Sequence, residues 1–235
     1  MYRMMRKHIE RLKEIIFREL NGYQAQFNDL SALEYMAPLI KSYLPWSGAS
    51  MSPVGIRLIL NDILINKRRT IVECGAGVST VMIANLLCGK DANFICIENN
   101  FSWMNIVQEI LVSQSMDNVT FIHAPLVCNR YSLAGSYWYD VECIKSELCS
   151  PVDLLLVDGP NAGAGKQASA RYPVGPELFP CLNPTASNVI LHDCDRPAER
   201  RIIGLWESQF DLSFQYGPKG SGIAFAPRGD MFTIV

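Results

Sequence analysis

The sequence has 235 residues, of which 49% are hydrophobic and 19% are charged. This length and composition suit one domain with a sizeable core, alone or with a helical extension. The formal net charge of −2 gives no reason to expect nucleic acid as a partner. No apolar run reaches the roughly 18 residues that a membrane span needs, and charged residues stand where a signal segment would be apolar. We therefore expect a cytoplasmic protein with free cysteines, because none of its eight cysteines forms a Cys-x-x-Cys pair.

An amphipathic helix is predicted over residues 2–20. Its apolar residues recur at steps of three and four positions and form one stripe: Met5, Ile9, Leu12, Ile16 and Leu20. Asn21 and Gly22 are expected to end this helix, and Asn28 and Asp29 to cap a second helix that runs to about Tyr43. The stripe predicts docking onto the domain or pairing in a homodimer, with a membrane surface as the alternative. We assign residues 1–50 to this helical cap and residues 51–235 to an α/β domain.

A strand, a tight turn and a helix start are predicted over residues 70–87. Gly75 and Gly77 let the backbone pass close to a ligand, and the helix start offers unpaired N–H groups. Thr80 stands where a dinucleotide fingerprint has glycine or alanine. Glu73 suits a cationic or hydroxyl-bearing ligand better than a pyrophosphate. The turn is therefore interpreted as a cradle for a nucleoside and an amino acid.

Three further strands end in polar side chains. The strand over residues 93–97 ends at Glu98, whose carboxylate suits the hydroxyls of a ribose. A continuously apolar strand over residues 152–157 delivers Asp158, and a strand over residues 186–191 delivers His192 and Asp193. Ligands of open α/β sheets bind at the carboxyl ends of the strands, so these side chains predict the site.

The remaining elements complete an open sheet. A third strand is expected over residues 119–126, where His123 is interpreted as structural. The loop 161–173 carries Arg171, either a substrate ligand or a solvated cation. A helix over residues 197–207 and a hairpin of strands 212–217 and 222–227 close the chain.

The segment Glu73-x-Gly75-x-Gly77-x-Ser79-Thr80 after a strand resembles motif I of the class I S-adenosylmethionine-dependent methyltransferases. The resemblance covers about residues 50–227. It implies a Rossmann-like open sheet of about seven strands, mostly parallel with an antiparallel strand in the C-terminal hairpin, plus N-terminal helices. It also implies S-adenosylmethionine as cofactor. The cofactor-binding residues would then be Glu73, Gly75, Ala76, Gly77, Ser79 and Thr80 for the methionine moiety, Glu98 and Asn99 for the ribose, and Asp158 for the amino group.

Methyl transfer would be an in-line displacement with a base that removes the acceptor proton. His192 or Asp158 would be this base, and Asp193 would orient it or ligate. Arg171 and Arg196 would hold the substrate. The segments Asp158-Gly159-Pro160 and His192-Asp193-x-Asp195-Arg196 are also loosely similar to glucuronoxylan 4-O-methyltransferases, which have alanine at the position of Gly159. That similarity implies O-methylation of a sugar, a glycan or another small polar acceptor.

Three alternatives stay open. Asp158 and Asp193 could hold a divalent metal, as in catechol-type O-methyltransferases, but Cys194 stands where those enzymes have asparagine and Asn161 where they have lysine. A nicotinamide-dependent oxidoreductase is a second possibility, against which Glu73 and the missing third glycine argue. The third is a non-catalytic scaffold that keeps the nucleoside site and acts through its N-terminal helix.

Overall fold

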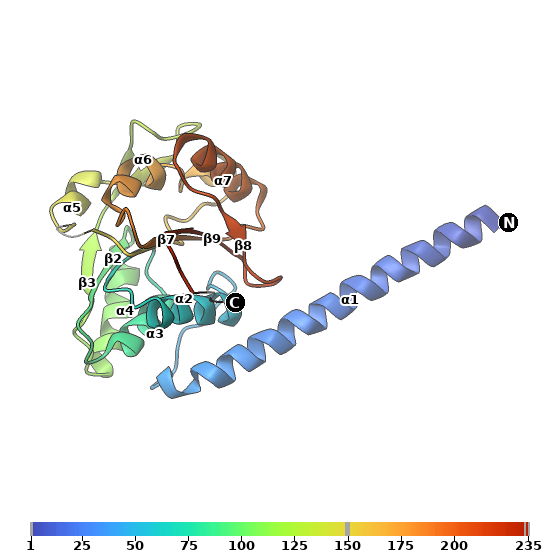
Figure 1. Ribbon diagram of the computed structural model, residues 1–235, viewed down its shortest axis with the longest axis horizontal. Helices are drawn as coiled ribbons and strands as arrows, with labels where there is room; N and C mark the ends of the chain where they lie inside the picture. The colour runs from blue at the N-terminus through green and yellow to red at the C-terminus, as the bar shows by residue number, and fades with distance from the viewer. Residues whose placement is uncertain (1, 149–150, 233, 235) are drawn as a thin grey trace.

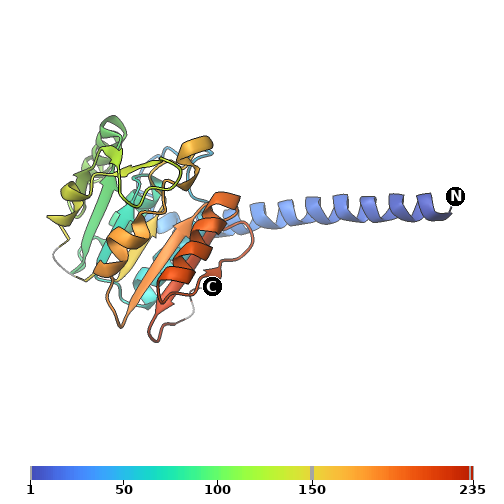
Figure 2. The same cartoon turned by 90° about the horizontal axis from the view of Figure 1, so that it is seen from above.

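The computed structural model describes residues 2–148, 151–232 and 234. It contains a seven-stranded sheet covered by helices on both faces, with one long helix that leaves the domain (Figures 1 and 2). Helices α2, α3 and α4 pack on one face and α5, α6 and α7 on the other. None of the described helices combines the length and the apolar character that a bilayer crossing needs.

The sheet has the strand order β3-β2-β1-β6-β7-β9-β8. All its pairs are parallel except β7 with β9 and β9 with β8. This agrees with the predicted fold class. Its strands are β1 (Thr70–Cys74), β2 (Asn93–Glu98), β3 (Thr120–His123), β6 (Leu154–Val157), β7 (Ser187–His192), β8 (Gln215–Tyr216) and β9 (Ile223–Arg228), and a separate hairpin joins β4 (Leu126–Cys128) to β5 (Tyr137–Tyr139).

The central strands are short and apolar because both of their faces are covered. Every residue of β6 and β7 is buried. The order reverses between β1 and β6, since β2 and β3 follow β1 on one side and β6 and β7 lie on the other. Such a reversal opens a crevice at the carboxyl ends of the strands, where ligands bind in open α/β sheets.

The helices of the domain begin and end near the predicted positions. Ser52 caps α2, because its hydroxyl accepts a hydrogen bond from the N–H of Gly55 at 3.1 Å. The helices are α2 (Pro53–Ile65), α3 (Val78–Leu87), α4 (Phe101–Ser113), α5 (Val141–Lys145), α6 (Val174–Leu178) and α7 (Pro197–Gln209), with 3-10 turns at η1 (Ala37–Leu39), η2 (Gly165–Ser169) and η3 (Phe179–Cys181).

The N-terminal region differs from the prediction. A single helix, α1 (Tyr2–Met36), replaces the two expected helices, so the expected break at Gly22 and the second helix to Tyr43 are wrong. One glycine costs a helix only about 1 kcal/mol relative to alanine and does not by itself end it. The helix ends at Met36, two residues before Pro38. A proline disfavours α-helical backbone in the residue before it, which here is Ala37.

Asp29 has a different role from the predicted cap. Its Oδ1 accepts a hydrogen bond from the N–H of Val54 at 3.2 Å. A residue of α1 thus provides a partner for one of the unpaired N–H groups at the start of α2. Ala32 and Met36 of α1 are buried in the same region. Only the C-terminal end of α1 therefore packs on the domain, and the rest projects away from it (Figure 1).

Candidate functional site

A cavity of about 370 Å³ lies at the carboxyl ends of β1, β2, β6 and β7. Residues from all four strand ends line it, as predicted for an open α/β sheet. The lining residues are Ala49, Gly75, Ala76, Glu98, Asn99, Asn100, Trp103, Tyr139, Asp158, Gly159, Pro160, Asn161, Arg171, Asp193 and Arg196.

Two glycines bring the loops after β1 and β6 into contact. Gly75 has φ +96°, and a Cβ there would lie 2.9 Å from the backbone nitrogen of Gly159. A Cβ on Gly159 would lie 2.8 Å from the Cα of Gly75 and would also collide with the hydroxyl of Tyr139. Neither position has room for a side chain, so bare backbone forms this part of the cavity wall.

Glu73 anchors the start of α3 beneath the glycine loop. It is fully buried and accepts hydrogen bonds from Ser79 Oγ at 2.5 Å and Thr80 Oγ1 at 2.6 Å. Thr80 Oγ1 in turn accepts from the N–H of Gly77 at 2.9 Å. Burial raises the pKa of Glu73 to about 8, although the two hydroxyls act to lower it. These four residues hold the loop from below and do not line the cavity, so their predicted contact with a ligand stays a prediction.

Glu98 occupies the end of β2 and is held by the backbone on both oxygens. Its Oε2 accepts from the N–H of Ala76 at 2.9 Å, and its Oε1 from the N–H of Asn100 at 2.7 Å. The side chain is buried yet lines the cavity. Each carboxylate oxygen has more than one acceptor position, so this carboxylate can still accept hydrogen bonds from a ligand.

Asn100 and Trp103 extend this wall, and the structure adds them to the predicted Asn99. Asn100 caps α4 by accepting from the N–H of Trp103 at 3.1 Å. The indole N–H of Trp103 donates to the carbonyl of Ala76 at 2.7 Å and so fixes the glycine loop. The side of the cavity next to Glu98 therefore combines amides with one large aromatic ring.

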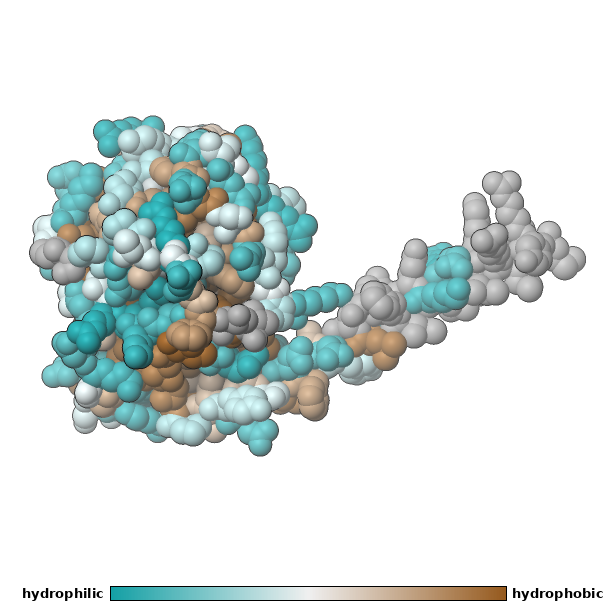
Figure 3. Space-filling model, in the orientation of Figure 1, coloured by the Kyte–Doolittle hydropathy of each residue, from teal (hydrophilic) through white to brown (hydrophobic). Residues whose placement is uncertain are grey.

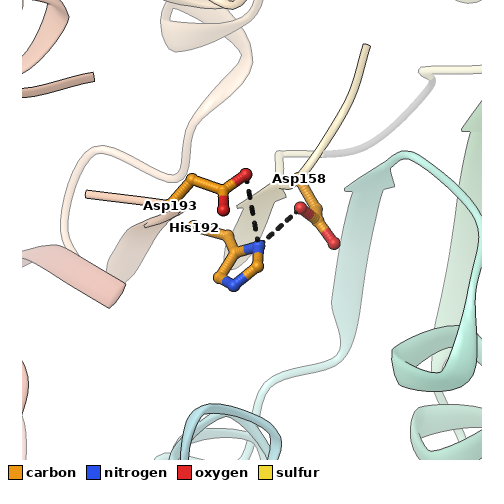
Figure 4. Close-up of side chains that lie close together, drawn as sticks. All are labelled: Asp158, His192 and Asp193. Carbon is orange, nitrogen blue, oxygen red and sulfur yellow. Dashed lines mark hydrogen bonds and ion pairs between the residues drawn. The ribbon is translucent and has the colours of Figure 1, made fainter. Parts of the chain in front are cut away.

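Asp158, His192 and Asp193 converge from the ends of β6 and β7 (Figure 4). His192 Nδ1 lies 2.7 Å from Asp158 Oδ1 and 3.7 Å from Asp193 Oδ2. Burial acts to raise the pKa of Asp158, but the hydrogen bond from His192 and the nearby cationic side chains outweigh it and hold the pKa below its ordinary value. Asp158 is therefore an ionised acceptor, and the hydrogen between the two side chains belongs to Nδ1.

The imidazole of His192 faces away from the cavity. Its Nε2 lies beside Gly222, where an added Cβ would be 3.4 Å away, and His192 is absent from the lining residues. Asp158 does line the cavity. Within the part of the chain that the structure describes, its side-chain hydrogen bonds and ion pairs all run through Oδ1. Figure 4 shows its other oxygen turned away from the imidazole.

Arg171 is buried at the centre of the cluster, only 3% exposed. Its Nη2 contacts Asp158 Oδ1 at 3.4 Å and Asp193 Oδ2 at 3.0 Å. Nη1 donates to the carbonyl of His192 at 2.9 Å, and Nη2 also donates to the carbonyl of Asp158. The half-exposed Arg196 reaches Asp193 Oδ1 at 2.9 Å. The alternative of a solvated loop cation is thus wrong for Arg171, and its predicted contact with substrate is untested.

Tyr139, the last residue of β5, is a further wall residue of the cavity. Its ring is fully buried in β5 and lines the cavity. Its hydroxyl has no hydrogen-bond partner among the described residues. Alternation along Tyr137-Trp138-Tyr139 does not identify this position, because Tyr137 is exposed while both Trp138 and Tyr139 are buried.

Comparisons with known proteins identify the fold. No family model matches the chain, and no curated protein matches it. A structure from Staphylococcus aureus assigned as a caffeoyl-CoA O-methyltransferase matches with a TM-score of 0.55 at 15% identity, over 93% of this chain and 100% of that one. An O-methyltransferase from Bacillus cereus in complex with SAH matches with a TM-score of 0.54 at 17% identity, over 89% and 97%.

An SAH-bound methyltransferase from Podospora anserina matches with a TM-score of 0.54 at 14% identity, over 86% of this chain and 88% of that one. These similarities extend over nearly the whole of each chain. Together with the strand order, they show that this protein has the Rossmann-like fold of the class I S-adenosylmethionine-dependent methyltransferases.

Proposed function

We propose that the protein is an S-adenosylmethionine-dependent methyltransferase that transfers a methyl group to a hydroxyl of a small polar acceptor, such as a sugar or a glycan. The observation that carries this proposal is Glu98. Its carboxylate is fixed at the cavity wall by two backbone N–H groups, at the strand end where dinucleotide folds hold a ribose. The same fold holds SAH in the B. cereus and P. anserina structures.

The cofactor would lie across the strand ends from Glu98 to Asp158. Glu98 would accept hydrogen bonds from the ribose hydroxyls, with Asn99, Asn100 and Trp103 around the adenine. The bare backbone at Gly75 and Gly159 leaves room for the methionine part. Asp158 would then face the amino group and the reacting methyl.

Asp158 is the proposed base, and His192 orients it. S-adenosylmethionine would supply an activated methyl group, which the acceptor oxygen would take in line while the C–S electron pair would remain on sulfur as a thioether. The methylated oxygen is then strongly acidic, so even the ionised Asp158 with its low pKa can take the proton. His192 does not line the cavity, which favours Asp158 over it as the group that meets the acceptor.

Titration calorimetry with S-adenosylmethionine tests the proposal. Glu98→Ala is expected to weaken binding at least tenfold, because it removes the ribose acceptors. Glu109→Ala, an exposed acid on α4, is the matched control and should bind like the wild type. Absence of binding by the wild type at millimolar ligand would refute the proposal. Binding of NADH in its place would favour the oxidoreductase.

We also propose that α1 pairs with α1 of a second copy. Four of its apolar side chains are more than half exposed and follow steps of three and four residues: Leu20, Tyr23, Phe27 and Leu30. Figure 3 shows hydrophobic surface along α1 beyond the domain. A second copy of this helix could cover that stripe.

A further inference from the structure

We propose that the guanidinium of Arg171 takes the place of a divalent cation between Asp158, His192 and Asp193. The three side chains each place one ligand atom within 4.8 Å of the others, which is close enough for a single metal ion. Carboxylate oxygens suit Mg²⁺ and Mn²⁺. Whether this site fits a metal depends on what already contacts those oxygens.

The contacts of Arg171 use the same oxygens that face His192. Asp158 Oδ1 and Asp193 Oδ2 lie 2.7 and 3.7 Å from His192 Nδ1. Arg171 Nη2 reaches the same two atoms at 3.4 and 3.0 Å. A cation bridging the two carboxylates through these two oxygens would have to displace this nitrogen.

Arg171 is held too firmly to move aside easily. Its Nη1 donates to the carbonyl of His192 at 2.9 Å, its Nε to the carbonyl of Pro160 at 3.4 Å, and its Nη2 to the carbonyl of Asp158. The guanidinium stays charged at every accessible pH. Since the side chain is almost fully buried, moving it away from its carboxylates would leave unpaired charges in the interior.

The charges of the cluster also balance without a metal. The carboxylates of Asp158 and Asp193 face the guanidinium groups of Arg171 and Arg196. Glu199 Oε1 lies 3.8 Å from Arg171 Nη1, and burial raises the pKa of this carboxyl group. A divalent ion would therefore add positive charge to a cluster whose carboxylates are already paired.

His192 Nδ1, which a metal would need as a ligand atom, is already in a hydrogen bond with Asp158 Oδ1 at 2.7 Å. A metal ligand must be the unprotonated ring nitrogen, so a metal would have to break this bond as well. The residues present do not fit a divalent ion, and Arg171 supplies a permanent positive charge in its place. In the proposed methyl transfer, on which this last step rests, Arg171 is a positioning residue that fixes the carboxylate of Asp158.

Titration of the full-length protein with Mn²⁺, followed by electron paramagnetic resonance, tests this inference. The wild type should bind no Mn²⁺ with a Kd below about 1 mM. Arg171→Met opens the three ligands and should gain one site at least tenfold tighter, and adding Asp193→Asn should abolish it. Arg196→Met, which removes the outer partner of Asp193, is the matched control and should gain no site.

A micromolar Mn²⁺ site in the wild type that is lost in Asp193→Asn would overturn the inference, and that measurement depends on no Arg171 variant. A folded Arg171→Met protein without a Mn²⁺ site would also overturn it. Arg171→Lys keeps a cation at this position and should remain without a site. The titration contains neither S-adenosylmethionine nor acceptor, so its outcome is separate from a failure of the proposed methyltransferase activity.

Discussion

At the scale of single residues, the contact between Gly75 and Gly159 makes Gly159 a sensitive position. Gly159→Ala would place a Cβ against the backbone of Gly75 and the hydroxyl of Tyr139, so one of the two loops must move. Overpacking of this kind costs about 1–3 kcal/mol. We expect a lower free energy of unfolding in urea and weaker binding of S-adenosylmethionine. Gly163→Ala, whose Cβ would meet nothing within 4 Å, is the control. Unchanged values for Gly159→Ala would contradict the contact.

Glu73 gives the protein a dependence of stability on pH. Its pKa of about 8 lies above the ordinary value of 4.5 for a glutamate, so the folded state keeps a proton that the unfolded state releases. Raising the pH between these values therefore favours unfolding. At 1.4 kcal/mol for each pKa unit, the wild type should lose about 3 kcal/mol between pH 5.5 and pH 8.5 from this group alone.

Glu73→Gln removes this titration while keeping polar partners for Ser79 and Thr80. The variant should gain stability over the wild type as the pH rises, which urea unfolding at pH 5.5, 7.0 and 8.5 would measure. A difference between the two proteins that stays constant across this range would show that the carboxyl group of Glu73 titrates normally.

At the scale of elements, α7 contains a glycine with no packing role. Gly204 is exposed, and a Cβ there would meet nothing within 4 Å. Alanine is more favourable than glycine inside a helix by about 1 kcal/mol. Gly204→Ala should therefore raise the urea concentration at the midpoint of unfolding, without changing the dependence of the free energy of unfolding on urea concentration. Gly175→Ala is the opposite case, because its Cβ would collide with the indole of Trp206, and it should destabilise the fold.

The exposed stripe of α1 predicts the state of association. We expect a dimer by light scattering after size exclusion. Phe27→Glu should shift it to a monomer, because a charge in the centre of the stripe opposes burial. Gly22→Glu adds the same charge to an exposed position on the other side of α1, where an added side chain meets nothing within 4 Å, and should leave the dimer intact. A monomeric wild type at 100 µM would rule out this pairing.

The elements also show where sequence patterns suffice. The strands β1, β2, β6 and β7 could be placed because short apolar runs end in a polar residue, and the cap at Ser52 because Pro53 follows it. The continuity of α1 could not be predicted, since the local preference of Gly22 is too weak to decide between one helix and two.

The positions of the acidic side chains in the site could be predicted from the sequence better than those of the cationic ones. Glu98, Asp158 and Asp193 follow strands and so had to reach one edge of the sheet. Arg171 lies in a loop rich in glycine and alanine, where a cation normally meets solvent, and its burial depends on carbonyls from two different strand ends. The direction of the His192 ring likewise depends on Asp158 and on the space beside Gly222, which no local pattern encodes.

At the scale of the whole molecule, the cavity has walls of two kinds. From Glu98 to the glycine loop, its polar contacts run through backbone N–H and carbonyl groups, as at Ala76 and Asn100. From Asp158 to Arg196, side chains from three separate segments hold one another. In the first wall side chains are held by the backbone, and in the second they are held mainly by one another.

The meeting of Gly75 with Gly159 has a consequence for how such a protein can change over time. Where main chain alone forms the cavity wall, there is no side chain whose replacement could change the contacts with a ligand. A substitution at Gly75 or Gly159 instead adds a Cβ that collides with the other loop. Variation is then confined to lining positions whose side chains face the cavity, such as Asn161 and Arg196, where a side chain can be replaced without moving the sheet. If the protein is the proposed methyltransferase, substitutions could change the acceptor that it takes while the part of the cavity that would hold S-adenosylmethionine stays the same.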